Sequence, residues 1–153
     1  MYKISFFKKI LEKINDIRIF IKLNCKISYL PGGKIYALGG NNGMGRLSSC
    51  ERYDPSANQW ELVASMNWPH SDASAATLNG KIYIAGGYDG QTVLSYAEVY
   101  DVQANQWTYL PFMNEARSGV SLVAFKGCLY AIGGFNGYDR LSSGKIFKGS
   151  LIP

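Results

Sequence analysis

A pair of adjacent glycines recurs three times along this chain at intervals of 47 residues. The pairs are Gly39 with Gly40, Gly86 with Gly87, and Gly133 with Gly134. Other residues keep the same interval, namely Tyr36, Tyr83 and Tyr130, Leu47, Leu94 and Leu141, Tyr53 and Tyr100, and Trp60 and Trp107. A repeat of this length indicates one structural unit copied along the chain, and such units stack or form a ring. The repeat favours a binding role over catalysis.

The second repeat shows what one unit contains. Residues 80–87 are a short apolar run that ends at the double glycine, which is typical of a buried strand. Strands are also predicted over 73–78, over 96–101 and over 105–110, where Pro111 ends the last one. Four antiparallel strands within about 47 residues are typical of one blade of a β-propeller.

The same pattern predicts strands in the other two units. The first unit has strands near 34–38, 47–53 and 58–63, and a weaker one over 27–31, where Pro31 and Gly32 disfavour pairing. The third has strands near 119–125, 128–132 and 141–147, while the next tryptophan of the period falls at 154, beyond Pro153. We therefore predict an all-β fold, a partial β-propeller of about 2.75 four-stranded blades. The blades span 27–65, 66–112 and 113–149, followed by a tail over 150–153.

The repeat weakens near its end. Lys145 stands where the other units have Glu51 and Glu98.

Residues 1–26 do not follow the repeat. Their apolar residues are spaced three and four apart, as on one face of a helix: Ile4, Phe7, Leu11, Ile14, Ile17 and Ile21. Seven basic and two acidic residues lie in this segment, whereas residues 27–153 hold nine of each. A short basic amphipathic helix is predicted, either a membrane-surface or targeting segment, a solvated helix, or sequence joined to the repeats by truncation or a gene-model error. The neutral repeats give no support for nucleic-acid binding.

Cysteine and histidine usage disfavours metal and redox chemistry. Cys25, Cys50 and Cys128 form no CxxC pair, so a disulfide framework or a zinc site is not expected, and reduced thiols indicate a cytoplasmic protein. His70 is the only histidine, which excludes a site with several histidine ligands. The glycine-rich loop over 39–45 has no following Gly-Lys-Ser/Thr, so it is not a P-loop. We expect no cofactor, no metal and no enzymatic activity.

These features together resemble the kelch repeat. Its marks are the double glycine after an apolar strand, a Tyr-Asp pair that ends the third strand, and a tryptophan that opens the fourth. They occur here at Tyr53 with Asp54, Trp60, Tyr100 with Asp101, and Trp107. Arg117 matches the arginine that usually opens a kelch unit, and His70 stands at that position one unit earlier. In such a fold the glycines allow close backbone approach, and the tyrosine and tryptophan fill the space between blades.

The resemblance implies a protein-binding function. BTB-kelch proteins are substrate adaptors of cullin-3 ubiquitin ligases, in which BTB and BACK domains hold the cullin and the propeller holds the substrate. Because only 26 to 32 residues precede the repeats, this chain alone is not expected to bind cullin-3. Some kelch proteins bind actin, so a cytoskeletal scaffold is an alternative, as is a non-functional truncated product. Unpaired blade edges predict self-association.

In the kelch family the loops after the double glycines line the substrate face. The candidate partner-binding residues are therefore Asn41, Asn42, Arg46, Tyr88, Asp89, Gln91, Phe135, Asn136, Tyr138, Asp139 and Arg140. Arginine and aromatic side chains on rigid loops are good anchors, which favours Arg46, Tyr138 and Arg140. Asn41, Asn42, Asp89 and Asn136 also fit a simpler role as turn formers.

Overall fold

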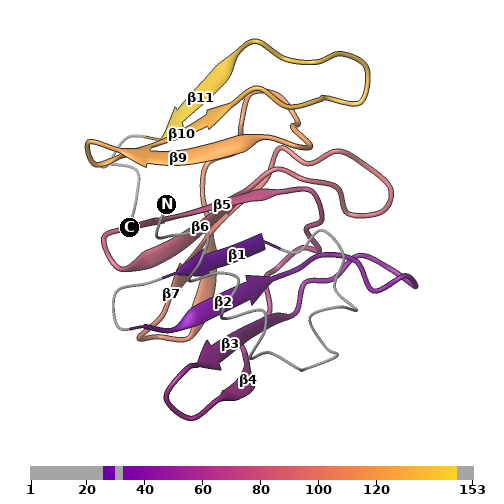
Figure 1. The fold of residues 1–153 in the computed structure, drawn as a ribbon. Coiled ribbons are helices and arrows are strands. Elements are labelled where there is room, and N and C mark those ends of the chain that lie inside the picture. Colours follow the sequence, from indigo (N-terminus) through magenta and orange to yellow (C-terminus); the bar gives the residue numbers. More distant parts are fainter. Residues whose placement is uncertain (1–25, 30–32, 148–153) are drawn as a thin grey trace, which may run out of the picture.

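The structure is a computed structural model, and it describes residues 26–29 and 33–147. Within them, eleven strands form three antiparallel sheets (Figure 1). The first sheet holds β1 (Lys26–Tyr29), β2 (Ile35–Leu38), β3 (Cys50–Asp54) and β4 (Gln59–Val63). The second holds β5 (Ser74–Leu78), β6 (Lys81–Ala85), β7 (Ala97–Asp101) and β8 (Gln106–Tyr109). The third holds β9 (Ser121–Phe125), β10 (Cys128–Ile132) and β11 (Gly144–Phe147).

The three sheets follow one another in chain order, face against face, as the blades of a propeller do (Figure 1). The predicted all-β fold, a partial propeller, is confirmed. The weak first strand of the first unit is present as β1, which pairs with β2 in the register Lys26↔Leu38 to Tyr29↔Ile35 and ends before Pro31. The helix predicted within 1–26 and the tail over 150–153 lie outside the described residues.

The central strand β6 of the second sheet is buried on both faces because the first sheet covers one face and the third sheet covers the other. Side chains of a strand alternate between its two faces. On β6, Ile82 and Ile84 therefore pack towards the first sheet with Tyr36 and Leu38. Tyr83, the residue between them, packs towards the third sheet.

Two apolar cores result, one at each boundary between sheets. The boundary of the first and second sheets contains Cys50, Met66, Tyr100 and Trp107 as well. The boundary of the second and third contains Ala85, Ala97, Val99, Leu110, Met113, Leu122, Leu129, Ala131 and Phe147. The sheets are thus held together chiefly by apolar burial between consecutive units.

The double glycines lie where the chain entering the next sheet passes closest. The amide of Gly87 donates a 2.7 Å hydrogen bond to the carbonyl of Arg117, and the amide of Gly40 donates one of 2.8 Å to the carbonyl of His70. A Cβ on Gly86 would stand 2.2 Å from the Arg117 carbonyl oxygen. Any side chain here would collide with backbone, so this approach requires glycine.

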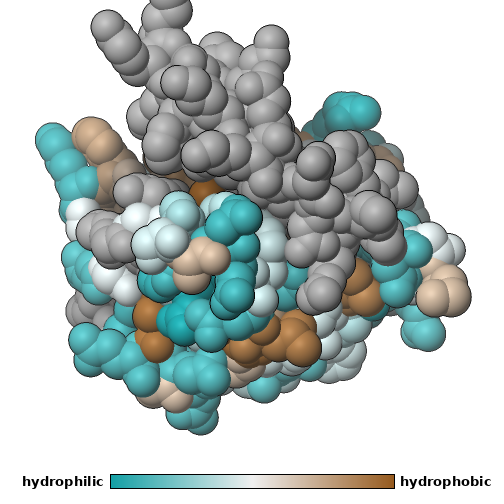
Figure 2. All heavy atoms as spheres, turned by 60° about the horizontal axis from the view of Figure 1, so that its bottom comes forward, coloured by the Kyte–Doolittle hydropathy of each residue, from teal (hydrophilic) through white to brown (hydrophobic). Residues whose placement is uncertain are grey.

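The far face of the third sheet is apolar and open. Val123, Phe125, Ile132 and Ile146 are each about half exposed there. Their counterparts one unit earlier are Ala76, Leu78, Ala85 and Val99, which the third sheet covers. On the side of the molecule seen in Figure 2, by contrast, hydrophobic residues form separate small patches within a mainly hydrophilic surface.

Candidate functional site

Three equivalent loops project from the same side of the molecule, each joining the second strand of a sheet to the third (Figure 1). Each loop follows a double glycine and is closed by a single β-bridge. The bridges are Asn41↔Arg46, Tyr88↔Val93 and Phe135↔Arg140. All eleven predicted partner-binding residues lie in these loops, so the structure brings them to one side.

One turn geometry shapes all three loops. The Asn42 side-chain oxygen accepts hydrogen bonds from the amides of Met44 and Gly45, at 3.0 and 2.9 Å. In the second loop, Asp89 accepts from the amides of Gln91 and Thr92, both at 2.7 Å.

The third loop repeats the turn, because Asn136 accepts from the amides of Tyr138 and Asp139, both at 2.8 Å. Burial by itself raises the pKa of Asp89, but the hydrogen bonds from Thr92 and Gln91 outweigh it and lower that pKa overall. These three side chains act as turn formers that hold the loops in one shape. Asn41 has a related contact, since its side-chain oxygen accepts from the Gly43 amide at 2.9 Å.

Neighbouring loops touch one another. The guanidinium carbon of Arg46 lies 5.4 Å from the centre of the Tyr88 ring, a cation–π contact between the first and second loops. Gly90 of the second loop lies beside the Arg46 side chain, since a Cβ there would stand at an ordinary contact distance of 3.5 Å from Arg46 Cγ. One unit later, Val93 occupies the position of Arg46 and lies beside Gly137 of the third loop. A Cβ on Gly137 would stand 3.8 Å from Val93 Cγ2.

The three loops therefore form one continuous ridge, which we call the loop ridge. The Arg46 side chain packs against Tyr88 within this ridge and is partly buried.

The side chains that the loop ridge presents to solvent are fewer than the predicted set. Tyr138 is 90% exposed, and Gln91, Asp139 and Arg140 are also exposed. Phe135 is 37% exposed. Met44, at 93%, is a prominent apolar group that the sequence reasoning missed, because it stands between two glycines that suggested only a turn.

A second aromatic surface lies outside the period and was also missed. Trp68 stacks on Tyr96 with ring centres 5.0 Å apart, and Phe112 meets Tyr96 edge-on at 5.0 Å. Trp68 and Phe112 are partly exposed. One unit later the positions of Trp68 and Tyr96 hold Glu115 and Ser143, so no repeat marks this cluster.

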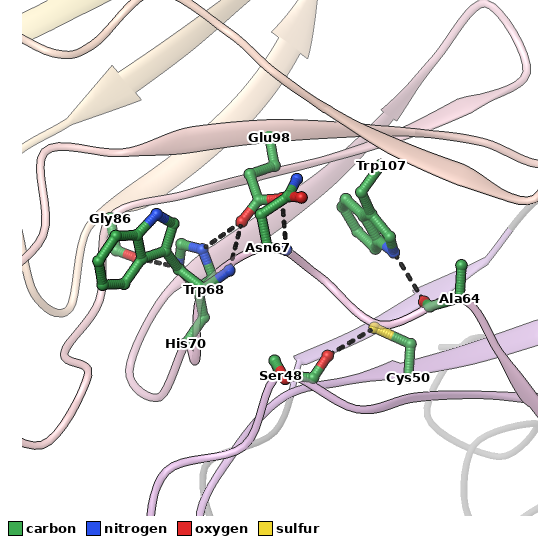
Figure 3. A network of polar contacts seen from close by, with 9 residues as sticks. All are labelled: Ser48, Cys50, Ala64, Asn67, Trp68, His70, Gly86, Glu98 and Trp107. Atoms are coloured by element: carbon green, nitrogen blue, oxygen red, sulfur yellow. Dashed lines mark hydrogen bonds and ion pairs between the residues drawn. The ribbon is translucent and has the colours of Figure 1, made fainter.

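A buried polar network centres on Glu98, whose side chain is fully enclosed (Figure 3). Its carboxylate accepts hydrogen bonds from the Asn67 amide and side chain, at 2.9 and 2.7 Å, and from the Trp68 amide at 3.1 Å. His70 Nε2 lies 3.3 Å from the same carboxylate, and Nδ1 lies 2.7 Å from the Gly86 carbonyl.

Both ring nitrogens of His70 thus face oxygen atoms that can accept hydrogen bonds. Burial by itself raises the pKa of Glu98, while hydrogen bonds from His70 and Asn67 outweigh it and lower that pKa overall. The network stabilises the start of the second unit by linking residues 67–70 to Gly86 and Glu98. Because its side chains His70 and Glu98 are enclosed, it is not open to a substrate.

The third unit has different side chains at the two equivalent positions, Arg117 and Lys145. Arg117, at the position of His70, donates hydrogen bonds to the carbonyls of Gly133 and Ser143 at 2.8 and 2.9 Å. Lys145, at the position of Glu98, donates to the Asn114 side chain at 3.1 Å. Asn114 is the repeat counterpart of Asn67, so the partner position is kept while the direction of the hydrogen bond is reversed: Asn67 donates to Glu98, and Asn114 accepts from Lys145.

Within residues 26–29 and 33–147, no three His, Cys, Asp or Glu side chains group as a metal site. Cys50 and Cys128, the two cysteines in that part of the chain, are not joined in a disulfide. None of the described segments is a helix long and apolar enough to span a membrane.

Three stacked sheets with equivalent loops on one side define the chain as part of a β-propeller. The Kelch motif family model matches residues 31–67, 69–114 and 116–147, and the chain belongs to the kelch family. The solved structure of YjhT has a similar fold, with a TM-score of 0.74 and 14% sequence identity over 85% of this chain and 50% of that chain.

Curated relatives match over short stretches. Kelch-like protein 7 of Rattus norvegicus is 49% identical over 35 residues, which is 23% of this chain and 6% of the relative. Kelch repeat-containing protein kel-10 of Caenorhabditis elegans is 40% identical over 67 residues, 43% and 11% of the two chains. Kelch repeat and BTB domain-containing protein F47D12.7 of the same organism is 42% identical over 45 residues, 29% and 8%.

The matched stretches thus cover between 6% and 11% of the length of these relatives. The sequence of residues 71–75 and its flanks also resembles one member of the family, kelch-like protein 10, and this assignment to a single member is a prediction.

Proposed function

We propose that the loop ridge binds a protein partner and that the chain serves as a recognition module. The observation that carries this is the continuity of the ridge. Three loops of one shape are each fixed by side-chain hydrogen bonds, and the contact of Arg46 with Tyr88 joins the first two. Together they present Met44, Tyr138 and Arg140 to solvent. Preformed loops lose little conformational entropy on binding, which favours affinity.

The finer proposal is that the partner is a protein to be ubiquitinated. It is supported by the kelch repeats and by the BTB domain that the name of one relative records. In this scheme cullin-3 binds only where a BTB domain is present in the full-length protein, while the loop ridge selects the target in the cytoplasm. Actin binding is the competing scaffold function.

The test is a comparison of captured partners. Tagged chain is expressed in cells in three forms: wild type, the ridge variant Met44→Ala/Tyr138→Ala/Arg140→Ala, and Gln103→Ala as a control. Gln103 is exposed in the turn between β7 and β8, at the opposite end of the strands from the loop ridge. Proteins are identified by mass spectrometry and their affinities are then measured with purified components.

The proposal expects a defined partner that wild type and Gln103→Ala bind equally and that the ridge variant binds at least roughly tenfold more weakly. A partner that all three forms bind equally contradicts it. Co-sedimentation with actin filaments decides the scaffold alternative, which fails if the chain stays in the supernatant.

A further inference from the structure

Two of the three loops of the loop ridge hold an asparagine followed by a glycine at the same repeat position. The pairs are Asn42 with Gly43, and Asn136 with Gly137. At this position of the middle loop the residue is Asp89. The glycine amide nitrogen of such a pair can attack the side-chain carbon of the asparagine, because glycine has no Cβ to hinder the approach. The asparagine position is therefore a candidate for covalent change in two loops.

Backbone amides activate the asparagine side chain in both loops. The Asn136 side-chain oxygen accepts hydrogen bonds from the amides of Tyr138 and Asp139, both at 2.8 Å. When a nucleophile adds to the side-chain carbon, this oxygen takes up negative charge, and two preorganised amide donors stabilise it as an oxyanion hole does. The Asn42 side-chain oxygen accepts the two equivalent hydrogen bonds. Activation of the asparagine is thus common to both loops.

The two loops differ at the amide that attacks. The Gly43 amide donates a 2.9 Å hydrogen bond to the side chain of Asn41. Attack requires this amide to lose its proton, so the hydrogen bond must break first. In the third loop Phe135 stands at the position of Asn41, and its side chain has no acceptor. Among the described residues, the Gly137 amide has no hydrogen-bond acceptor.

The third loop is also open to water. Gly137 is exposed and Asn136 is partly exposed. The same holds for Gly90 and Asp89 in the middle loop, which has a described loop on either side. The exposure of Asn136 therefore follows from the shape of the loop and does not depend on what lies beyond the third sheet.

We propose that Asn136 is a site of spontaneous deamidation. The Gly137 nitrogen bonds to the Asn136 side-chain carbon and closes a succinimide ring, while the side-chain nitrogen leaves as ammonia with the proton of the Gly137 amide. Water then opens the ring at either carbonyl, which gives aspartate or isoaspartate. Both products place a carboxylate where the loop ridge had a neutral amide. The site does not depend on the function proposed for the loop ridge.

The middle loop shows that the aspartate product fits the turn. Asp89 accepts hydrogen bonds from the amides of Gln91 and Thr92, both at 2.7 Å, as Asn136 does from its own pair of amides. Aspartate at this position therefore keeps the turn and adds a negative charge to the loop that carries Arg140. Isoaspartate lengthens the main chain by one carbon atom and should open the turn.

The test follows the purified full chain during incubation at neutral pH and body temperature. Samples are digested with a protease at acidic pH, and mass spectrometry measures the conversion of amide to carboxyl at Asn136, Asn42 and Asn79. Asn79 precedes Gly80 in the turn between β5 and β6, where its side chain has no hydrogen bond among the described residues. Asn136 should react at least about fivefold faster than Asn42, the factor that one hydrogen bond supplies, and also faster than Asn79.

Two variants that exchange the residue before the asparagine locate the cause. Asn41→Ala removes the acceptor of the Gly43 amide and should raise the rate at Asn42 about fivefold. Phe135→Asn supplies an acceptor in the third loop and should lower the rate at Asn136 by a similar factor. Thermal melts verify that both variants are folded.

The proposal is overturned if Asn136 in the folded chain reacts no faster than Asn42 or Asn79. It is also overturned if the chain unfolded in urea shows the same ratio of rates, because the loop geometry then has no effect. Unchanged rates in both exchanged variants would contradict it as well, since the Asn41 acceptor would then give Asn42 no protection.

Discussion

At the scale of single residues, Gly86 and Gly133 share a conformation but not a neighbour. Their φ angles are +65° and +67°. A Cβ on Gly86 would meet the Arg117 carbonyl oxygen at 2.2 Å, whereas one on Gly133 would meet its nearest atom, the Leu141 carbonyl oxygen, at 3.4 Å. We expect Gly133→Ala to lower the free energy of unfolding by about 1 kcal/mol, through the positive φ alone. Gly86→Ala should lower it by about 3 kcal/mol or more, because backbone must also move.

Urea unfolding of the two variants beside wild type checks this pair. Equal losses would show that the close approach at Gly86 does not hold the second and third units together.

Glu98 gives a prediction about acid stability. Its pKa in the folded protein is lowered from the ordinary 4.5, so its ionised form stabilises the fold above that ordinary value. This stabilisation is lost as the pH falls through the lowered pKa. Glu98→Gln should therefore reduce the free energy of unfolding by about 2 kcal/mol at pH 7, and the difference from wild type should shrink below pH of about 4.

Urea unfolding of both proteins at a series of pH values measures that difference. Asp89 and Asp101, whose pKa values are also lowered, are present in both proteins and cancel in the comparison. A difference that stays constant from pH 7 to pH 3 would contradict the assignment.

The structural roles of individual residues differ in how well they can be predicted from the sequence. Gly39, Gly86 and Gly133 share a positive φ, and Gly39 and Gly86 also face a carbonyl of the following unit. Their spacing alone predicted the units. Arg46 resembled an exposed anchor, yet it lies over Tyr88. The sequence did not reveal this, because a contact between two residues 42 positions apart leaves no local pattern. His70 and Glu98 are enclosed together although nothing near either in sequence marks the pair.

At the scale of strands, Trp60 and Trp107 occupy equivalent positions on β4 and β8. Trp107 donates its indole N–H to the Ala64 carbonyl, whereas the buried Trp60 indole nitrogen has no hydrogen-bond partner among the described residues. Replacement by phenylalanine keeps most of the apolar ring and removes the donor. We expect Trp107→Phe to lower the free energy of unfolding by about 1 kcal/mol more than Trp60→Phe does.

Chemical denaturation followed by circular dichroism compares the two strands. A larger loss for Trp60→Phe would mean that the indole hydrogen bond does not strengthen the boundary between the first and second sheets.

Most strands could be predicted because turns flank them and their interiors are apolar. β1 was the weak case, since Pro31 and Gly32 disfavour strand structure, and the strand ends at Tyr29 before both. The shapes of the loops could not be predicted beyond their turn residues. Which loop touches which depends on how two sheets are stacked, and the residues of one unit do not encode that.

At the scale of the whole molecule, the open face of the third sheet predicts self-association. Val123, Phe125, Ile132 and Ile146 expose apolar surface that equivalent residues of the second sheet bury. Burial of such side chains favours association by about 1.5–3 kcal/mol each when complete. The wild-type chain should therefore sediment as larger species when its concentration rises, while Phe125→Glu/Ile146→Lys should stay monomeric.

Leu62→Glu is the control, because it changes an exposed apolar residue on the first sheet. It should sediment as wild type does. A concentration-independent monomer for the wild-type chain would refute the prediction.

The hydrogen bonds between consecutive units have a consequence for how the sequence of such a repeat chain can evolve. Across each joint the same main-chain hydrogen bonds recur: the amides of His70 and Arg117 donate to Leu47 and Leu94, and those of Met66 and Met113 donate to Ser48 and Ser95. The side chains of His70 and Arg117 make their hydrogen bonds within their own units instead. Since main-chain groups are common to all residues, a duplicated unit can join its neighbour at once and then acquire its own set of buried charges. Units that arise by duplication can therefore keep their contacts with one another while their side-chain networks diverge.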